Sequence, residues 1–200
     1  MCKRLFDIFF SVLGIIILTP FLVIIAIIIL ADSRGGIFYL QTRVGKNNRD
    51  FRLMKFRTMR PNSDKKGLLT VGGRDSRITR TGYYLRKYKL DELPQLINVL
   101  KGEMSFVGPR PEVRKYVELY NQEQKKVLTV KPGITDYASI EYINENELLA
   151  KSNNPEKEYI ENIMPAKLKI NLIYIEKAGL NTDLKIIIKT ILKILFKRKQ

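Results

Sequence analysis

Two adjacent carboxylates, Asp91 and Glu92, are the strongest candidates for chemistry in this sequence. They precede Leu93-Pro94, and proline is favoured at the first position of a helix, so both carboxylates are expected at a helix start. Acidic residues at such a start cap the helix and complement its dipole. The same position favours a bound phosphate, so either carboxylate could attack phosphorus or bind Mg²⁺. The residues alone leave both interpretations open.

Four cationic residues could bind a phosphate near this pair: Lys55, Arg57, Arg86 and Arg110. Arg110 lies between two prolines in residues 108–111, which would fix its backbone for bidentate phosphate binding or simply form a connector. Lys55 and Arg57 should share one face of a strand, which could equally be an amphipathic edge strand. Arg86 lies on a helix just upstream of the carboxylates, where it could join them or face solvent.

The composition narrows the chemistry further. The chain has 200 residues, no histidine, a single cysteine at position 2, and a net charge of +16. The missing histidine excludes histidine general bases and histidine metal sites, and one cysteine excludes disulfides within the chain and zinc–cysteine clusters. The charge favours an anionic partner: nucleic acid, an anionic membrane surface, or a phosphorylated substrate.

An apolar segment without charged residues covers residues 8–31. As one helix it would be about 36 Å long, enough to span a bilayer as a single anchor. A cleaved signal peptide fits less well, because no clear cleavage site follows. Thr19-Pro20 lies in its middle, and Pro20 lacks the N–H that a regular helix needs. We therefore expect residues 1–31 to form a re-entrant membrane segment, a helix that is broken there by a kink, enters one leaflet and returns to the same side.

The charges beside this segment agree with a re-entrant path. Lys3 and Arg4 precede it and Arg34 follows it, so the positive-inside rule draws both ends to the cytoplasm. A second membrane contact is expected near the C-terminus. Over about 183–197, lysines recur every four residues beside isoleucine and leucine, which is typical of an interfacial helix or of an ordinary surface helix over a core.

Residues 32–200 predict one cytoplasmic domain of the α+β class, dominated by helices, with a small β element. Strands are expected over 37–40 and 50–54, joined by a turn at 45–48. A polar, glycine-rich stretch over 60–76 indicates a mobile loop. Helices are expected over 79–87, 94–100 and 112–128, and over 141–170 with breaks at Pro155 and Pro165.

Several short motifs resemble a known family. They are Arg43-Val44-Gly45, Lys55-Phe56-Arg57-Thr58-Met59, Leu90-Asp91-Glu92-Leu93-Pro94-Gln95-Leu96, Val107-Gly108-Pro109-Arg110-Pro111-Glu112 and Lys131-Pro132-Gly133-Ile134-Thr135. Together they resemble the bacterial sugar transferase family, the monotopic phosphoglycosyl transferases, over roughly residues 3–137. The chain is similar to the small members of this family.

The resemblance implies transfer of a sugar 1-phosphate from a UDP-sugar to undecaprenyl or another polyprenyl phosphate, with release of UMP. This would start the assembly of a surface or glycoprotein glycan at the cytoplasmic face of the bacterial inner membrane. The resemblance implies that Asp91 attacks the phosphate next to the sugar and forms a covalent intermediate, that Glu92 assists, and that Mg²⁺ near Asp91 neutralises the diphosphate. The other implied site residues are Arg110, Lys55 and Arg86 on substrate phosphate, with Glu103 and Arg57 in support.

Two other functions fit the residues: a membrane-tethered nucleic-acid binder, and a membrane-anchored scaffold in which Asp91 and Glu92 only cap a helix. No nucleic-acid motif is recognisable, so we expect no nucleic-acid partner. The sequence departs from the family pattern after residues 133–135. A glycine, an aromatic residue and an Asn-Gly-Arg-like turn are common there, whereas this chain continues with Asp136-Tyr137 and has no arginine through Lys151.

Overall fold

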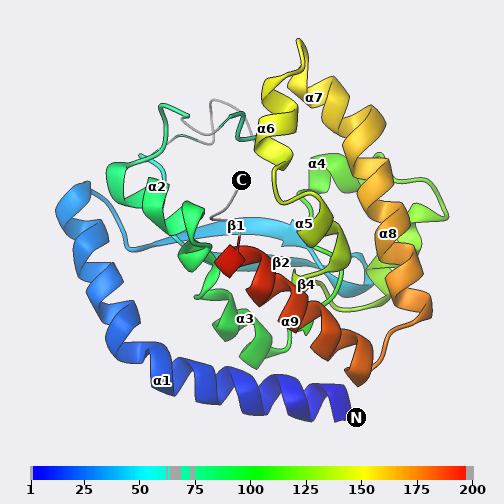
Figure 1. Cartoon of the computed structure of the whole chain (residues 1–200), viewed down its shortest axis with the longest axis horizontal. Helices are drawn as coiled ribbons and strands as arrows, with labels where there is room; N and C mark the ends of the chain where they lie inside the picture. Colours follow the sequence, from blue (N-terminus) through cyan, green and yellow to red (C-terminus); the bar gives the residue numbers. More distant parts are fainter. Residues whose placement is uncertain (1, 62, 64–68, 73–74, 197–200) are drawn as a thin grey trace.

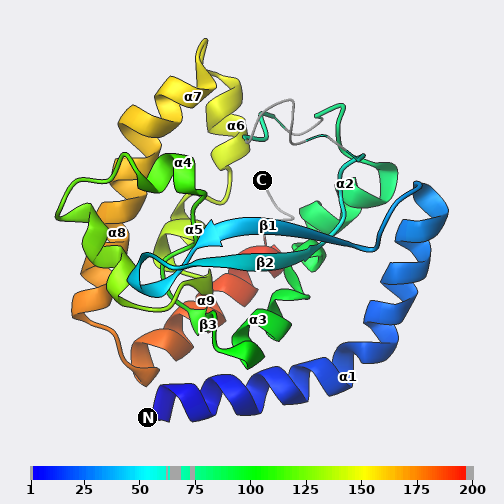
Figure 2. The same cartoon turned by 180° about the vertical axis from the view of Figure 1, so that it is seen from behind.

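The computed structural model of the chain describes residues 2–61, 63, 69–72 and 75–196. Helices dominate it, in agreement with the predicted α+β class, and they surround a central two-stranded ribbon (Figure 1). The long helix α1 (Cys2–Asp32) follows two edges of the molecule. Seen from behind, the ribbon lies in front and the last helix lies beyond it (Figure 2). The site described below is formed between these two faces.

Helix α1 bends sharply near its middle, where Pro20 lies (Figures 1 and 2). The sequence predicted a helix broken by a kink at Thr19-Pro20, and the structure has one continuous helix with a bend near this position. Proline removes only one backbone donor, and the Thr19 hydroxyl donates to the Ile15 carbonyl oxygen at 2.6 Å. By its length and composition, this helix could cross a membrane. Only 11% of the residues in its most apolar 18-residue stretch are buried.

Both ends of α1 are fixed to the same folded body. At the first turns, Lys3 forms an ion pair with Asp183 at 2.8 Å, and the buried Asp7 carboxylate accepts a hydrogen bond from the Phe106 N–H at 3.2 Å. At the other end, Asp32 accepts a hydrogen bond from the Thr81 N–H at 2.9 Å. Between these ends, most of the large apolar side chains of α1 are exposed.

The central ribbon pairs β1 (Phe38–Val44) with β2 (Asp50–Phe56) in antiparallel register, joined by the short helix η1 (Lys46–Asn48). Both strands and the turn were predicted, and the strands extend beyond the predicted bounds. The turn contains left-handed backbone at Asn47 and Asn48, which asparagine tolerates better than most residues. The predicted mobile loop over 60–76 lies partly outside the described residues.

Three elements lead into the site: α2 (Arg80–Lys87), the one-turn helix η3 (Leu90–Glu92) and α3 (Gln95–Lys101). The predicted helices over 79–87 and 94–100 are confirmed. Thr79 caps α2 by accepting a hydrogen bond from the Gly82 N–H at 2.9 Å. Gly102 ends α3 with a φ of 86°, a conformation that glycine adopts without strain.

The continuous helix predicted over 112–128 is wrong. The structure has only α4 (Arg114–Val117) and, after a turn, the 3₁₀ helix η4 (Gln124–Thr129). The Asn121 side chain accepts a hydrogen bond from the Gln124 N–H at 2.8 Å, and such local bonds compete with helix propagation. Two very short parallel strands, β3 (Ser105–Val107) and β4 (Gly133–Thr135), flank this region.

The predicted helical region over 141–170 consists of α5 (Tyr137–Glu141), α6 (Glu145–Ala150), α7 (Pro155–Glu158), the π-helical segment η5 (Tyr159–Ile163) and α8 (Met164–Glu176). Pro155 begins α7, as expected, but the predicted break at Pro165 is wrong. The chain stays helical from 155 to 176, because the π-helical segment η5 lies directly before Pro165 and its wider turn accommodates the missing N–H.

The last helix, α9 (Leu180–Phe196), begins three residues before the predicted start, and Lys197 lies outside the described residues. One face is buried at Asp183 and Ile186. Lys189 lies over the Tyr137 ring, 5.5 Å from its centroid. Large apolar residues on a third side remain exposed: Leu184, Ile188, Ile191, Leu192, Leu195 and Phe196. An ordinary surface helix would bury that side, so α9 has the pattern expected of an interfacial helix.

Candidate active site

Asp91 and Glu92 lie in η3, not in the first turn of α3, whose N-cap is Pro94. The sequence predicted both carboxylates at the start of this helix, but they lie in a separate 3₁₀ turn that precedes it. Neither carboxylate caps α3, because no side-chain cap hydrogen bond forms there. Lys89, immediately before this turn, has a φ of 58°, which is uncommon for a residue with a Cβ. The helix-cap interpretation of the pair is therefore wrong.

Glu92 is buried between two cations. Its Oε1 lies 3.0 Å from Lys55 Nζ, and Arg110 donates to both of its carboxylate oxygens. Burial alone would raise the pKa of Glu92, but Arg110, Lys55 and Lys89 together hold it well below the ordinary value. The ionised Glu92 in turn raises the pKa of Arg110. Glu92 thus holds two cations in place and is a poor carrier of protons.

Asp91 has a different environment from its neighbour. Its side chain is buried, with 6% of the residue exposed, and Oδ1 has no hydrogen-bond partner among the described residues. Burial, followed by the charge of Glu92, raises the pKa of Asp91. A buried, unpartnered carboxylate oxygen is costly for a fold, and such groups occur where a ligand or a reaction uses them.

Asp91 faces a polar cavity of about 280 Å³ between the central ribbon, α2 and the helices that follow α4. Its cationic lining residues include Arg43, Lys55, Arg60, Arg77, Arg86 and Arg110. Arg86, whose pKa burial lowers, donates to the Thr70 hydroxyl at 3.2 Å. All four cations that the sequence singled out, Lys55, Arg57, Arg86 and Arg110, thus line the same cavity as Asp91. This cavity can neutralise a strongly anionic group such as a diphosphate.

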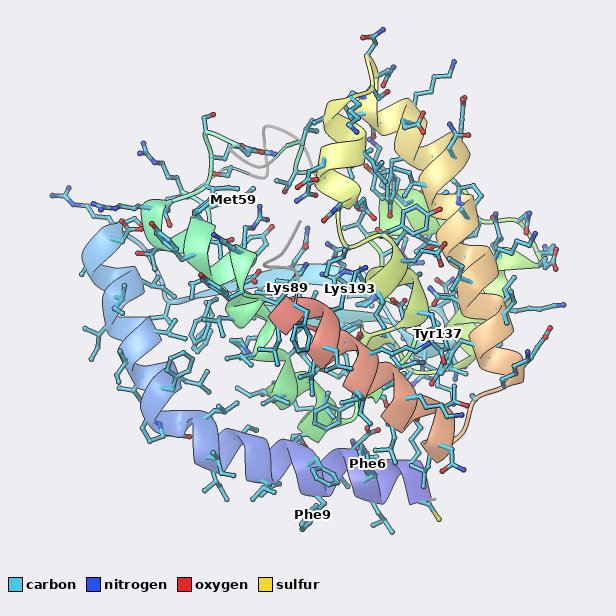
Figure 3. The ribbon with its side chains drawn as sticks, viewed as in Figure 1. Phe6, Phe9, Met59, Lys89, Tyr137 and Lys193 are labelled. Carbon is cyan, nitrogen blue, oxygen red and sulfur yellow. The ribbon has the colours of Figure 1, made fainter. Side chains whose placement is uncertain are left out.

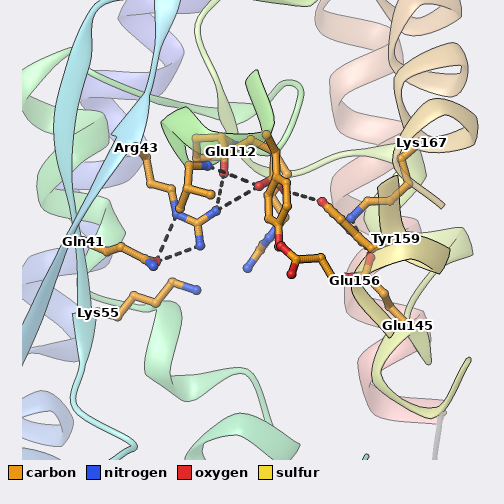
Figure 4. Close-up of polar contacts among 12 residues, drawn as sticks. Gln41, Arg43, Lys55, Glu112, Glu145, Glu156, Tyr159 and Lys167 are labelled. Atoms are coloured by element: carbon orange, nitrogen blue, oxygen red, sulfur yellow. Dashed lines mark hydrogen bonds and ion pairs between the residues drawn. The ribbon is translucent and has the colours of Figure 1, made fainter. Parts of the chain in front are cut away.

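Part of the lining of the polar cavity is a hydrogen-bond network (Figure 4). Arg43 donates to Gln41 Oε1 at 2.7 Å, and its guanidinium lies 3.4 Å from Glu112 Oε2. The Tyr159 hydroxyl donates to Glu112 Oε1 at 2.6 Å. Lys167 and Glu145 form a further ion pair, with 2.6 Å between Nζ and Oε2. These contacts join β1 to the helices of the second half of the chain.

The loop of Arg110 is held rigidly by a residue that sequence reasoning did not assign. The buried Asp136 accepts hydrogen bonds from the Arg110 N–H at 3.0 Å and the Ser139 N–H at 2.5 Å. The backbones also approach closely, because a Cβ on Gly133 would lie 2.1 Å from the Gly108 nitrogen. Asp136 stands where the sequence departs from the family pattern, and that departure was the available signal.

The two residues expected in support have different positions. Arg57 lines the polar cavity, and its guanidinium donates to the Ser33 carbonyl at 2.7 Å and the Arg34 carbonyl at 2.8 Å, at the C-terminal end of α1. Glu103 does not line the cavity and accepts a hydrogen bond at 2.7 Å from Asn98, whose side chain also donates to the Arg52 carbonyl. Arg57 thus attaches α1 to the site, and Glu103 contacts the asparagine that attaches α3 to the central ribbon.

A buried carboxylate beside a cation-lined cavity, on a body tied to an exposed apolar helix, fits enzymes that transfer phosphoryl groups through a carboxylate at a membrane. The comparison of sequences agrees. The chain belongs to the bacterial sugar transferase family, whose sequence model it matches over residues 1–197. Family membership and the apolar helix α1 both indicate association with a membrane.

The names of individual relatives state what those proteins do. The chain is 43% identical over 141 residues to the UDP-N-acetylgalactosamine-undecaprenyl-phosphate N-acetylgalactosaminephosphotransferase of Aeromonas hydrophila, covering 69% of this chain and 33% of that protein. It is 34% identical over 194 residues to the UDP-glucose:undecaprenyl-phosphate glucose-1-phosphate transferase of Escherichia coli (strain K12), covering 96% and 39%. The exopolysaccharide production protein PSS of Rhizobium leguminosarum bv. phaseoli is 36% identical over 204 residues, covering 98% and 96%. The chain therefore spans about a third of the first of these relatives and almost all of the last.

Proposed function

We propose that this protein transfers a sugar 1-phosphate from a UDP-sugar to a polyprenyl phosphate such as undecaprenyl phosphate and releases UMP, as an early step of exopolysaccharide assembly. The observation that carries this proposal is the contrast between the two carboxylates. Glu92 is neutralised by Lys55 and Arg110, whereas Asp91 Oδ1 is buried, unpartnered and faces the cation-lined cavity. The names of two relatives, which state a UDP-sugar and undecaprenyl phosphate as substrates, support the same kinds of donor and acceptor.

In the first step, an ionised Asp91 oxygen attacks the phosphorus attached to the sugar. A bond forms between that oxygen and phosphorus, the bond to the bridging oxygen breaks, and UMP leaves with the electron pair. In the second step, a phosphate oxygen of the polyprenyl phosphate attacks the same phosphorus. The bond to Asp91 breaks, the carboxylate is regenerated, and a polyprenyl diphosphate sugar is formed. Lys55, Arg86 and Arg110 would stabilise the charge on the phosphate oxygens in both steps.

Mg²⁺ fits this site as an ion held largely by substrate. Among the described residues no cluster of three or more histidine, cysteine or acidic ligands occurs. Mg²⁺ commonly binds through one or two carboxylates, substrate phosphates and water, and Asp91 Oδ1 is a free oxygen of the right kind. Bound there, Mg²⁺ would neutralise diphosphate charge, while the chain's own cations orient the donor.

The path of α1 supports placing the site at the surface of one leaflet. Lys3 and Asp7 at one end, and Asp32 at the other, all bond to the same folded body. If the apolar stretch enters a membrane, both ends therefore return to the side that carries the catalytic body. The bend at Pro20 would be its deepest point, as in a re-entrant helix on the cytoplasmic face of the bacterial inner membrane.

The decisive experiment measures UMP released by the detergent-solubilised protein with Mg²⁺, undecaprenyl phosphate and a panel of UDP-sugars. We expect UMP release with one donor and its loss in Asp91→Asn. Asp50→Asn, an exposed carboxylate in an ion pair with Arg114, is the matched control and should stay active. Without acceptor, mass spectrometry should detect one sugar phosphate on Asp91. Full activity of Asp91→Asn, or no UMP from any donor, would contradict the proposal.

A further inference from the structure

A second cavity, of about 260 Å³, lies on the other side of the carboxylate pair. Asp91 lines the polar cavity and Glu92 lines this one, and Arg110 lines both. Its lining is mainly apolar: Leu93, Leu96, Phe106, Ile134, Ile140, Ile143 and Ile194. Two adjacent residues of one short turn therefore separate a cation-rich cavity from an apolar one, and one arginine connects them.

The apolar cavity has a cationic rim. Lys89 and Lys193 both line it and both are exposed, and Figure 3 shows them side by side at the end of α9. Lys89 adopts its left-handed backbone at this position, a conformation that persists where the surroundings or the function require it. The Ser139 hydroxyl also lines the cavity, is buried, and has no hydrogen-bond partner among the described residues.

The cavity continues into the surface that we assign to the membrane. Ile194 of α9 lines it, while Ile191 and Leu195 on the neighbouring side of the same helix are 51% and 63% exposed. Apolar side chains therefore run along α9 from its exposed side to the cavity. An occupant with an anionic head and a hydrocarbon tail could move along α9 without exposing its tail to water.

We propose that this cavity binds the acceptor: the first part of the polyprenyl chain lies in it, and the acceptor phosphate lies against Lys89, Lys193 and Arg110. The inference rests on the proposed function and adds the residues that recognise the acceptor separately from the donor. Arg110, shared by both cavities, is the point at which the acceptor phosphate meets the phosphosugar carried by Asp91.

The test separates the two half-reactions. Formation of the phosphosugar enzyme without acceptor reports on the donor side, and the KM for undecaprenyl phosphate reports on the acceptor side. Lys193→Gln and Lys89→Asn, the latter chosen because asparagine tolerates left-handed backbone, should each raise this KM about tenfold. That change corresponds to about 1.4 kcal/mol per charge-assisted contact. The rate of the donor half-reaction should stay within about twofold of the unmodified protein.

A matched control comes from the same helix. Lys185→Gln on α9 does not touch the cavity and should leave the acceptor KM unchanged, whereas Ile194→Gln should raise it. Dodecyl phosphate should compete with the acceptor more strongly than inorganic phosphate, and Ile194→Gln should remove that advantage. An unchanged KM in Lys193→Gln and Ile194→Gln, or an equal loss of the donor half-reaction, overturns this inference. A protein that forms no phosphosugar intermediate at all refutes the proposed function instead.

Discussion

Replacing Asp136 by alanine should destabilise the protein and misplace Arg110. Asp136 is fully buried and accepts two backbone hydrogen bonds, from Arg110 and from Ser139 in the first turn of α5. Losing a helix cap costs about 0.5–2 kcal/mol, and leaving the Arg110 N–H unsatisfied costs about 1–3 kcal/mol. Alanine also relieves the desolvation of a buried charge, so we expect a net loss of about 2–4 kcal/mol. For a chain of this size, that lowers the Tm by about 5–15 °C.

Thermal unfolding in detergent, followed by circular dichroism, measures this loss. Asp50→Ala is the control, because the Asp50 and Arg114 side chains are 48% and 36% exposed and such a pair contributes about 0–1 kcal/mol. Asp136→Asn keeps one acceptor oxygen and should fall between the two. We also expect kcat/KM for the donor to drop more than tenfold in Asp136→Ala at temperatures where it remains folded. A Tm within 2 °C of the unmodified protein would refute the assignment of Asp136 as the residue that holds the Arg110 loop.

Three further predictions follow from the site and its supports. Burial lowers the pKa of Lys55 to about 8, although the charge of Glu92 raises it. As the pH rises through about 8, the Lys55 ammonium loses its proton, so kcat/KM for the donor should fall. Lys55→Arg should remove this alkaline limb, and a pH–rate profile that keeps it contradicts the assignment. Glu92→Gln removes a charge that raises the pKa of Lys55, so the limb should move to lower pH in the same assay. Gly133→Ala should prevent folding, because its Cβ would lie 2.1 Å from the Gly108 nitrogen, whereas Gly179→Ala meets no atom within 4 Å and should fold normally in the same expression and melting assays.

Local signals in the sequence predicted the elements next to the site. Pro94, a residue favoured at the first position of a helix, predicted the start of the helix after Asp91 and Glu92 to within one residue. The region after Glu112 was mispredicted, because its apolar residues serve a core that local periodicity does not describe. Tyr116 in α4, Tyr120 between the two helices and Val127 in η4 are all buried in one cluster. Tertiary packing there overrides the helical pattern.

For the site, residue type and neighbouring prolines were enough to select Asp91, Glu92 and Arg110. What the sequence could not provide is the difference between the two carboxylates. It arises from Lys55, on a strand 37 residues upstream of Glu92, and from Arg110, 18 residues downstream of it. The hydrogen-bond partners of Arg57 could not be predicted for a related reason. It lies only two residues after Lys55, but it follows the end of β2, and its guanidinium lies at the end of α1.

The contacts of α1 attach this helix to α9, which lines the cavity that we propose for the acceptor. Lys3, near the start of α1, pairs with Asp183, near the start of α9, and the Asp183 side chain is only 4% exposed. Lys3 also donates to the Val107 carbonyl at 2.9 Å, so the first turns of both helices should stay at one level. Charged groups are costly at the bilayer centre, so in a membrane this junction would lie at the lipid–water interface, with the exposed apolar sides of both helices toward the lipid. The far end of α9 then brings Lys193 and Ile194 to the cavity beside Glu92. We infer that a polyprenyl phosphate reaches Asp91 along α9 with its tail still in the leaflet. Lys3→Met should therefore raise the KM for the acceptor more than the KM for the UDP-sugar, and equal changes in both would contradict this route.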